Sequence, residues 1–346
     1  MRPLELLQRA HRNSQPLVLG LSGGPDSMAL FEFLLHYQGM RPFELHVAHV
    51  DHGWRKESAK EAEFLKELCA RHHCPFHLKR LRAAACSDIE NSARSERLIF
   101  FEEIVKKTGA QALCLAHHSD DLAETVLKRI FETAPLERIG AFSFESRIGD
   151  LVIWRPLIHL SKGEIAAFGF DDATNRDRRF LRARLRQDLI PEIERHFGKG
   201  VRSALVRLSK RSHKLDAYLE KRCLAWLGEK KLPLGIDFTG AEVFEIEYVL
   251  SRRADLPANL REELSEELAS LAANRFFDLG RKKIVVHKGS LLIAESFELT
   301  GERNGSFDIA RPWFKLWTEG GSWPIEEVKA LPAPLRPYID FRAKIV

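Results

Sequence analysis

The chain has 346 residues, of which 45% are hydrophobic and 30% charged, and its formal net charge is +5. This composition is that of a soluble protein of about two domains, and its mildly basic balance does not by itself indicate a nucleic-acid partner. The start of the chain lacks the apolar segment of a signal peptide, and no apolar stretch approaches the roughly 20 residues that cross a bilayer. The five cysteines fit a reducing compartment, so we expect a cytoplasmic protein with no membrane partner.

Apolar strand-like segments alternate with helical patterns throughout the first half of the chain. This alternation is typical of βαβ units and predicts an α/β fold whose parallel sheet has helices on both faces. Short polar motifs follow three of the strand segments, at the sheet edge where ligands bind in such folds. The expected strands cover 17–21, 43–49, 76–81 and 111–116, and the expected helices cover 27–38, 57–73, 90–107 and 119–132.

After about residue 150 the pattern changes to longer helices followed by alternating strands. Turns are expected at Gly280 and Gly289, between short apolar runs. The expected elements are a strand, turn and helix start in 154–165, a long helix over 199–229, an interrupted helical region over 240–273 and strands over 276–297. We therefore expect a first domain over 1–198, a helical linker over 199–235 and a small α+β domain over 236–346, whose tail, 299–346, is assigned to no element.

The stretch CARHHCPFH, residues 69–77, concentrates cysteine and histidine. It could form half of a zinc site, but such sites pair a short hook of ligands with a second hook further along, and none is evident. The pattern favours the end of a helix, followed by Pro75 and a strand.

The stretch LVLGLSGGPDSMAL, residues 17–30, places two glycines between a strand and a helix. Glycines allow positive φ and close approach of a ligand, and the helix that follows directs its positive end at the same point. This arrangement predicts a phosphate-binding loop made of Ser22, Gly23, Gly24, Pro25, Asp26 and Ser27. A carboxylate is unexpected in a pure anion site, so Asp26 is the candidate ligand of a Mg²⁺ ion that accompanies the phosphates.

The loop lacks the lysine and spacing of a Walker A motif. SGGPDS instead resembles the PP-loop of the ATP pyrophosphatase superfamily. That resemblance implies cleavage of ATP between the α and β phosphates, with transfer of the adenylate to a substrate oxygen.

Further motifs follow the loop in a fixed order and narrow the resemblance. They are HVDHGWRKES (49–58), NSARSERLIFF (91–101), LAHHSDDLAETVL (115–127), WRPL (154–157) and TNRDRRFLRARLRQDLIP (174–191). Together they resemble the bacterial tRNA(Ile)-lysidine synthetases, strongly over about residues 15–200 and more weakly over 240–297. The resemblance implies that 236–346 is a tRNA-binding domain.

The resemblance also implies a reaction. ATP, with Mg²⁺, adenylates the C2 oxygen of the wobble cytidine in the isoleucine tRNA with a CAU anticodon, and pyrophosphate leaves. The ε-amine of free L-lysine then attacks C2 and AMP leaves. Homodimers are common in this family, and no feature of this sequence decides the oligomeric state.

A cluster of acidic residues is expected at the start of the helix over 119–132, with Ser119 as its N-cap. Asp121 and Glu124 are three residues apart and share a helix face, so they can hold an ammonium group and accept its proton. We assign this pair to lysine, and Asp120 to a metal or to structure. The alternative is that the acidic residues only balance the helix dipole.

Other polar residues at the strand ends and on the helices are candidates for the nucleotide. Arg94 and Arg97 lie one turn apart, and guanidinium groups there could stabilise charge on the α-phosphate, with a solvated helix face as the alternative. One of His117 and His118 is a candidate for contact with phosphate or nucleotide, with a histidine satisfied within its loop as the alternative. At the end of the second strand, a base or ribose contact competes with plain turn chemistry for His49, Asp51, His52 and Arg55. Of these we assign His52, Arg94 and His117 to nucleotide binding and Arg97 to catalysis.

Arginines recur every four residues in the segment 176–186. This spacing puts Arg178, Arg182 and Arg186 on one face, which suits phosphates along a tRNA, although a solvated face is the alternative for any one of them. Arg178 and Arg186 are assigned to tRNA, and the resemblance places Arg182 at a catalytic arginine. The helix over 199–222 adds Lys199, Arg202, Arg207, Lys210, Arg211, Lys214, Lys221 and Arg222.

The chain departs from the family pattern at several positions. Ala183 replaces an asparagine, Glu132 and Thr133 replace an Arg-Gly pair, and Trp54 and Leu98 replace a leucine and a tyrosine. These changes leave open a tRNA-binding protein that has lost catalysis. A tRNA-thiolating relative would need catalytic cysteines at the strand ends, and an amidotransferase relative would need a source of ammonia.

Overall fold

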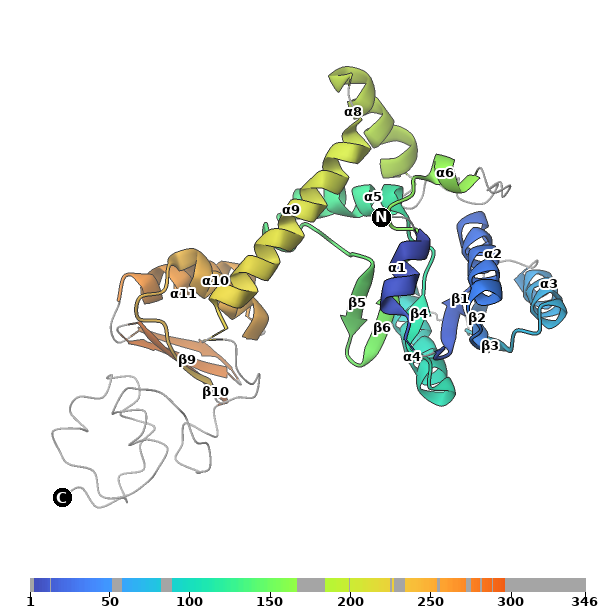
Figure 1. Ribbon diagram of the computed structural model, residues 1–346. Coiled ribbons are helices and arrows are strands. Elements are labelled where there is room, and N and C mark those ends of the chain that lie inside the picture. The colour runs from blue at the N-terminus through green and yellow to red at the C-terminus, as the bar shows by residue number, and fades with distance from the viewer. Residues whose placement is uncertain are drawn as a thin grey trace, which may run out of the picture. The chain divides into compact units, whose positions relative to one another are not determined.

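The computed structural model describes residues 3–12, 14–51, 58–81, 89–166, 184–198, 200–224, 226, 234–253, 256–271, 275–280, 282–287 and 289–295 (Figure 1). The chain divides into two compact units, Met1–Lys214 and Leu215–Val346. This division falls inside helix α9 (Val201–Arg222) and within the range expected as the linker. Each unit is described by itself below.

The first unit contains a six-stranded sheet with the order β3-β2-β1-β4-β6-β5. Its strands are parallel except for β5, which pairs with β6 in antiparallel orientation. The four strands expected from the alternating pattern are confirmed, whereas β5 was missed because its residues are mostly exposed and polar. The bounds are β1 Leu17–Gly20, β2 Leu45–Asp51, β3 Phe76–Arg80, β4 Ala112–Cys114, β5 Glu145–Ile148 and β6 Leu151–Trp154.

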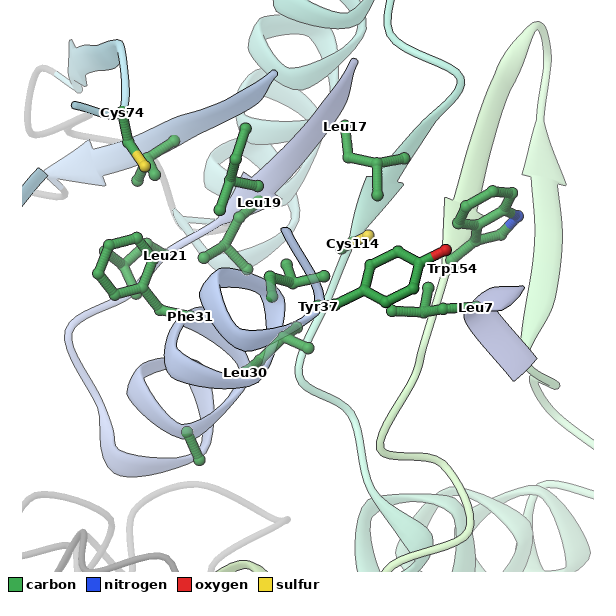
Figure 2. Close-up of a cluster of buried hydrophobic side chains, with 14 of the residues drawn as sticks. Leu7, Leu17, Leu19, Leu21, Leu30, Phe31, Tyr37, Cys74, Cys114 and Trp154 are labelled. Carbon is green, nitrogen blue, oxygen red and sulfur yellow. The ribbon is translucent and has the colours of Figure 1, made fainter. Parts of the chain in front are cut away.

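Helices lie on both faces of this sheet because alternate residues of the strands are apolar on both sides. Leu17 and Leu19 of β1 pack with Leu30 of α2 and Leu65 of α3 on one face (Figure 2). Val18, between those two leucines, packs with Phe101 and other residues of α4 on the opposite face. The helices are α1 Pro3–Ala10, α2 Pro25–Met40, α3 Ser58–Arg71, α4 Ile89–Thr108, α5 Ser119–Phe131, α6 Lys162–Ala166, the π-helical segment η1 Leu185–Leu189 and α8 Ile190–Phe197.

The order of the strands places a crevice beside β1. The chain runs outward from β1 to β2 and β3 on one side and then returns to β4 on the other side. In open α/β sheets such a reversal opens a ligand crevice at the carboxyl ends of the two strands. The phosphate loop follows β1 and the acidic helix α5 follows β4, so the two motifs meet there.

The stretch CARHHCPFH forms a helix end and a strand start, as expected. Helix α3 ends at Arg71 and strand β3 begins at Phe76. Cys69 and Cys74 are buried, and burial raises the pKa of their thiols to about 12 and about 11. These thiols are therefore core groups that stay protonated at neutral pH.

The second unit is the small α+β fold that the sequence predicted, with one further strand, β7. Two helices pack on an antiparallel sheet with the order β7-β10-β9-β8, around buried residues such as Leu264 and Ile284. The turns at Gly280 and Gly289 have φ of 70° and 79°, where glycine is strongly preferred. The elements are β7 Leu234–Asp237, α10 Val243–Arg253, α11 Ala258–Ala269, β8 Arg275–Leu279, β9 Lys282–His287 and β10 Ser290–Glu295.

None of the helices in the described part of the chain is long and apolar enough to span a membrane.

Candidate active site

The loop between β1 and α2 is closed by its own serines. The Ser27 hydroxyl donates to the carbonyl oxygen of Gly24 at 2.8 Å and accepts from the backbone N–H of Ser22 at 3.2 Å. Gly23 has φ +85°, and Gly24 is the N-cap of α2, with Pro25 in the first turn. The first backbone N–H groups of a helix have no partners within the helix, so this loop presents donors to an anion.

A buried histidine supports the loop from the neighbouring strand. His49 of β2 is 5% exposed, and its Nδ1 lies 2.7 Å from the carbonyl oxygen of Leu21, the residue before the loop. Its ring stacks on Phe76. His49 therefore supports the loop from a neighbouring strand, a role that the sequence had not predicted.

The N-cap of α5 is His118, so the prediction of Ser119 is wrong. His118 Nδ1 accepts from the backbone N–H of Asp120 at 3.2 Å, and the Asp121 carboxylate accepts from the backbone N–H of His118 at 3.1 Å. This reciprocal pair is a capping box in which imidazole replaces the usual hydroxyl. Ser119 becomes the first helical residue, with its N–H bonded to the carbonyl of Leu160.

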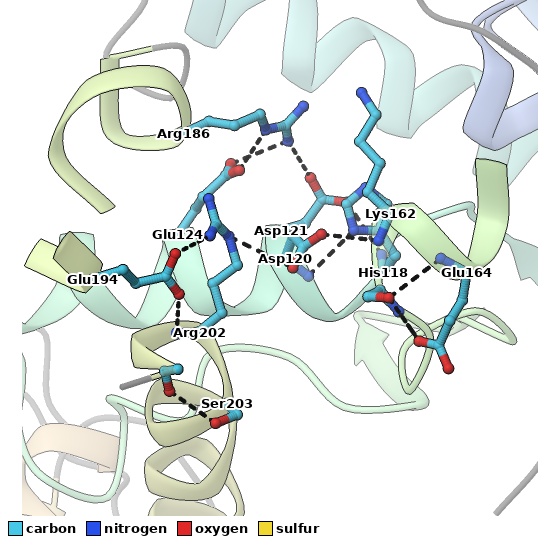
Figure 3. Close-up of polar contacts among 12 residues, drawn as sticks. His118, Asp120, Asp121, Glu124, Lys162, Glu164, Arg186, Glu194, Arg202 and Ser203 are labelled. Carbon is cyan, nitrogen blue, oxygen red and sulfur yellow. Dashed lines mark hydrogen bonds and ion pairs between the residues drawn. The ribbon is translucent and has the colours of Figure 1, made fainter. Parts of the chain in front are cut away.

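Asp121 and Glu124 share a helix face, as predicted, and Arg186 binds both (Figure 3). Arg186 Nε lies 2.5 Å from Glu124 Oε1, and Nη2 lies 2.8 Å from Asp121 Oδ1 and 3.2 Å from Glu124 Oε2. Glu124 is 2% exposed, so its charge depends on this guanidinium. The sequence had assigned Arg186 to the tRNA instead.

Neighbouring charges outweigh the effect of burial on the pKa values of this cluster. Burial by itself lowers the pKa of His118, but Asp26 and Asp121 outweigh it and the net shift is upward. Burial would raise the pKa of Asp121, yet His118, His117 and Arg186 together hold it below its usual range. Burial opposes the charge of Arg186 as well, and Glu124 and Asp121 raise its pKa.

Asp120 points away from that pair and has a structural role. Its Oδ2 accepts from the backbone N–H of Lys162, the first residue of α6, at 2.9 Å. Its Oδ1 lies 3.8 Å from Nε of Arg202, which also bonds Glu194 (Figure 3). Of the two roles expected for Asp120, these contacts support the structural one.

The remaining predicted residues fall into two groups, those that the structure describes and those that it does not. Arg97 is exposed on α4, and the ring of His117 lies 5.1 Å from that of Phe142, so their roles stay predictions. The side chain of Arg94 and the whole of Arg55, His52, Arg178, Arg182 and Ala183 are outside the described residues.

The basic helix is exposed only in part. Arg202 pairs with Glu194 and Arg222 pairs with Glu245. Five further basic residues of α9 are exposed, and four of them recur at spacings of three or four on one face. These four are Arg207, Lys210, Arg211 and Lys214, and the fifth is Lys221.

Two structural features near the site were not predicted from the sequence. His118 joins the acidic helix to the phosphate loop, since its Nε2 lies 3.6 Å from Asp26 Oδ2, and only the adjacent histidines in HHSDD hinted at it. Arg155, after β6, is buried over the ring of Phe142 and bonds the Ser143 carbonyl. Arg155 belongs to the motif WRPL, to which no role was assigned from the sequence.

The strand order, the glycine loop and the carboxylates beside it define a PP-loop ATP-binding protein. Residues 2–193 match the PP-loop domain family, which covers more than half of the chain. The U34-tRNA thiolase NcsA from Methanococcus maripaludis has a similar fold, with a TM-score of 0.50, 15% identity and coverage of 61% of this chain and 78% of that one.

Similar curated proteins narrow the class. A tRNA(Ile)-lysidine synthase from Protochlamydia amoebophila is 36% identical over 334 residues, covering 91% of this chain and 72% of the relative. One from Chlamydia pneumoniae is 42% identical over 214 residues, covering 59% of this chain and 66% of the relative. The chain belongs to the tRNA(Ile)-lysidine synthase family, which confirms the resemblance found in its motifs.

Proposed function

We propose that this chain ligates free L-lysine to C2 of the wobble cytidine in the isoleucine tRNA with a CAU anticodon, at the expense of ATP. One observation carries the proposal. A phosphate-type loop and a largely buried carboxylate pair lie beside each other at the carboxyl ends of β1 and β4, joined through His118, Asp26 and Asp121. The two half-reactions, adenylation and amine attack, need these two sites side by side.

The phosphate loop serves the first half-reaction. Backbone N–H groups around Gly23 and Asp26 would hold the triphosphate, and the Ser22 and Ser27 hydroxyls fix the loop. The cytosine C2 oxygen attacks the α-phosphorus, and pyrophosphate leaves. Asp26 lies in the first turn of α2 with a partly exposed carboxylate, which fits a Mg²⁺ ligand, and the ion would offset phosphate charge. Among the described residues no group of three or more His, Cys, Asp or Glu side chains forms a metal site by itself.

The acidic pair serves the second half-reaction. Among Asp26, Asp121, Glu124 and Arg186, three carboxylates face one guanidinium, so this cluster is suited to receive a further cation such as the ammonium of lysine. One carboxylate then takes the proton that the ammonium must lose before its nitrogen attacks C2. The C2–O bond breaks, and AMP leaves with that oxygen.

The basic residues serve the tRNA. The exposed face of α9 formed by Arg207, Lys210, Arg211 and Lys214 suits phosphates, and Arg178 is assigned to the same substrate, whereas Arg182 keeps its assignment as a catalytic arginine. We place the reaction in the cytoplasm, where lysine, ATP and tRNA meet, and the chemistry works equally in a monomer or a homodimer.

The test is the ATP-dependent transfer of radiolabelled lysine to a CAU-anticodon isoleucine tRNA transcript. Wild type should label the RNA, Asp26→Ala and Glu124→Ala should not, and Glu102→Ala, which removes an exposed carboxylate paired with Lys106, should match wild type. A transcript with uridine at the wobble position controls for the target base.

The rival reading, a tRNA-binding protein without catalysis, predicts the reverse. It would bind the transcript while leaving it unlabelled. Thiolation is disfavoured by burial of the four cysteines that the structure describes: Cys69, Cys74, Cys114 and Cys223.

A further inference from the structure

His118 is the most enclosed polar side chain of the site, with no exposed surface. Its two ring nitrogens have different surroundings. Nδ1 accepts from the backbone N–H of Asp120 at 3.2 Å, so the proton of the neutral ring is on Nε2. The Nε2–H group is therefore available to whatever lies on the other side of the ring.

Two carboxylates from different helices lie there. Nε2 is 3.4 Å from Asp121 Oδ2, in the first turn of α5, and 3.6 Å from Asp26 Oδ2, in the first turn of α2. Neither contact is a hydrogen bond in this structure, so Nε2 is a buried polar atom that lies between the phosphate loop and the amine site. Because α2 follows β1 and α5 follows β4, the histidine spans the crevice at the reversal of the sheet.

We propose that His118 is a positioning residue that fixes Asp26 and Asp121 relative to each other, and so aligns the adenylated base with the attacking amine. This inference rests on the proposed function. A displacement of about 1 Å between reacting groups can cost on the order of 100-fold in rate. His118 would prevent that displacement by keeping its buried Nε2–H close to both carboxylates, 3.4 Å from Asp121 and 3.6 Å from Asp26.

Two substitutions separate this role from the cap. In His118→Asn, the amide oxygen can replace Nδ1 as acceptor for the Asp120 N–H, and asparagine is a favoured N-cap, but nothing reaches the carboxylates. In His118→Gln, the longer amide can place an N–H near the position of Nε2 while the cap is lost. His118→Ala loses both contacts.

The proposal predicts opposite orders for stability and for activity. Melting temperatures should rank wild type and His118→Asn above His118→Gln and His118→Ala. For lysine, kcat/KM should fall on the order of 100-fold in His118→Asn and less in His118→Gln. If His118 served only as a helix cap, the variants would rank in the same order by melting temperature and by kcat/KM. Wild-type activity in His118→Asn would overturn the proposal.

A spectroscopic readout needs no turnover. In long-range ¹H–¹⁵N spectra of the imidazoles, the Nε2 signal of His118 should move in Asp26→Asn and also in Asp121→Asn. An Nε2 chemical shift that stays unchanged in either variant overturns the proposal, even where that variant is too unstable for the activity assay. His46→Asn is the matched control. It removes another buried histidine, near the start of β2 and away from the carboxyl ends of the strands, and it should leave activity unchanged.

The two kinds of failure can be told apart. Wild type that forms no lysidine would refute the proposed function, and the nitrogen spectra would still report whether His118 joins the two carboxylates. Wild type that forms lysidine, with an active His118→Asn, would refute only the positioning role.

Discussion

The guanidinium of Arg186 sets the charge of the acidic pair. Arg186 comes from a segment 62 residues after Glu124, and its planar fork contacts both Glu124 and Asp121. A lysine at the same position would keep the charge but not the two-pronged geometry. Arg186 therefore orients the pair before any substrate arrives, and it contributes to the lowered pKa of Asp121.

Arg186→Gln should destabilise the first unit by about 3 kcal/mol, because it leaves the buried carboxylate of Glu124 without this partner. Arg186→Lys should cost less. Urea unfolding followed by fluorescence measures both values. Equal stability of Arg186→Gln and wild type would mean that the ion pair does not persist in solution.

At the scale of elements, the loop over 132–144 is fastened to α9. The Gly140 N–H donates to Ser212 Oγ at 2.7 Å, and the Ser209 hydroxyl donates to the Gly140 carbonyl at 2.6 Å. This loop begins at Glu132 and Thr133, where the chain departs from the family pattern. Contacts to α9 therefore hold this loop in place although its first residues depart from the family pattern.

Gly140→Ala tests that attachment. A Cβ there would lie 3.0 Å from the Ser209 carbonyl oxygen and 3.0 Å from Ser212 Oγ, so we expect a loss of about 1–3 kcal/mol in the free energy of unfolding. Gly39→Ala is the control, because a Cβ at Gly39 meets nothing within 4 Å, and it should be neutral or more stable by up to about 1 kcal/mol. Equal effects of the two substitutions would contradict the close contact.

The connection after α1 carries a buried histidine with a pH-dependent cost. His11 is 2% exposed, its Nε2 donates to the Gln15 carbonyl, and its Nδ1 accepts from the Tyr37 hydroxyl. Burial lowers its pKa below 6.5, the Gln15 carbonyl opposes that shift, and Arg41 adds to it. Between the folded and unfolded pKa values the unfolded chain binds more protons, so stability falls as the pH falls below 6.5.

His11→Phe should reduce this dependence while keeping an aromatic ring against Phe43 and Trp154. The free energy of unfolding, measured in urea at pH 7 and at pH 5, should drop more in wild type than in the variant. The contribution of one histidine cannot exceed about 1.4 kcal/mol per pH unit. The same slope in both proteins would show that His11 is not the group responsible.

Local patterns predicted most of the elements, and non-local contacts account for what they missed. Alternating apolar residues in 17–21 and 276–297 located strands, and SGGPDS located the phosphate loop. The exposed strand β5 carries no such pattern. Ser119 is a more common cap than histidine, so choosing His118 required knowing that Asp121 would close the capping box. Sequence spacing could not predict that Arg186 pairs with Glu124, because 62 residues separate the two.

At the scale of the whole molecule, each of the two units has buried apolar residues of its own. Leu30 and Leu34 belong to a core inside Met1–Lys214, whereas Leu264 and Leu268 belong to a core inside Leu215–Val346. Both sites of the proposed chemistry lie in the first unit. The second unit would then contribute to the tRNA and not to the nucleotide.

Matched core substitutions test this division. Leu264→Ala and Leu30→Ala each remove a fully buried leucine side chain, at a cost of about 2–5 kcal/mol. Leu264→Ala should lower the stability of the second unit, weaken tRNA binding and leave the affinity for ATP unchanged, because no residue proposed for the nucleotide lies there. Leu30→Ala, on the helix that follows the phosphate loop, should reduce the stabilisation that ATP gives. Calorimetry with and without ATP, together with filter binding of the tRNA, measures both effects. Loss of ATP affinity in Leu264→Ala would show that the second unit supports the nucleotide site, and the assignment of the chemistry to the first unit alone would then be wrong.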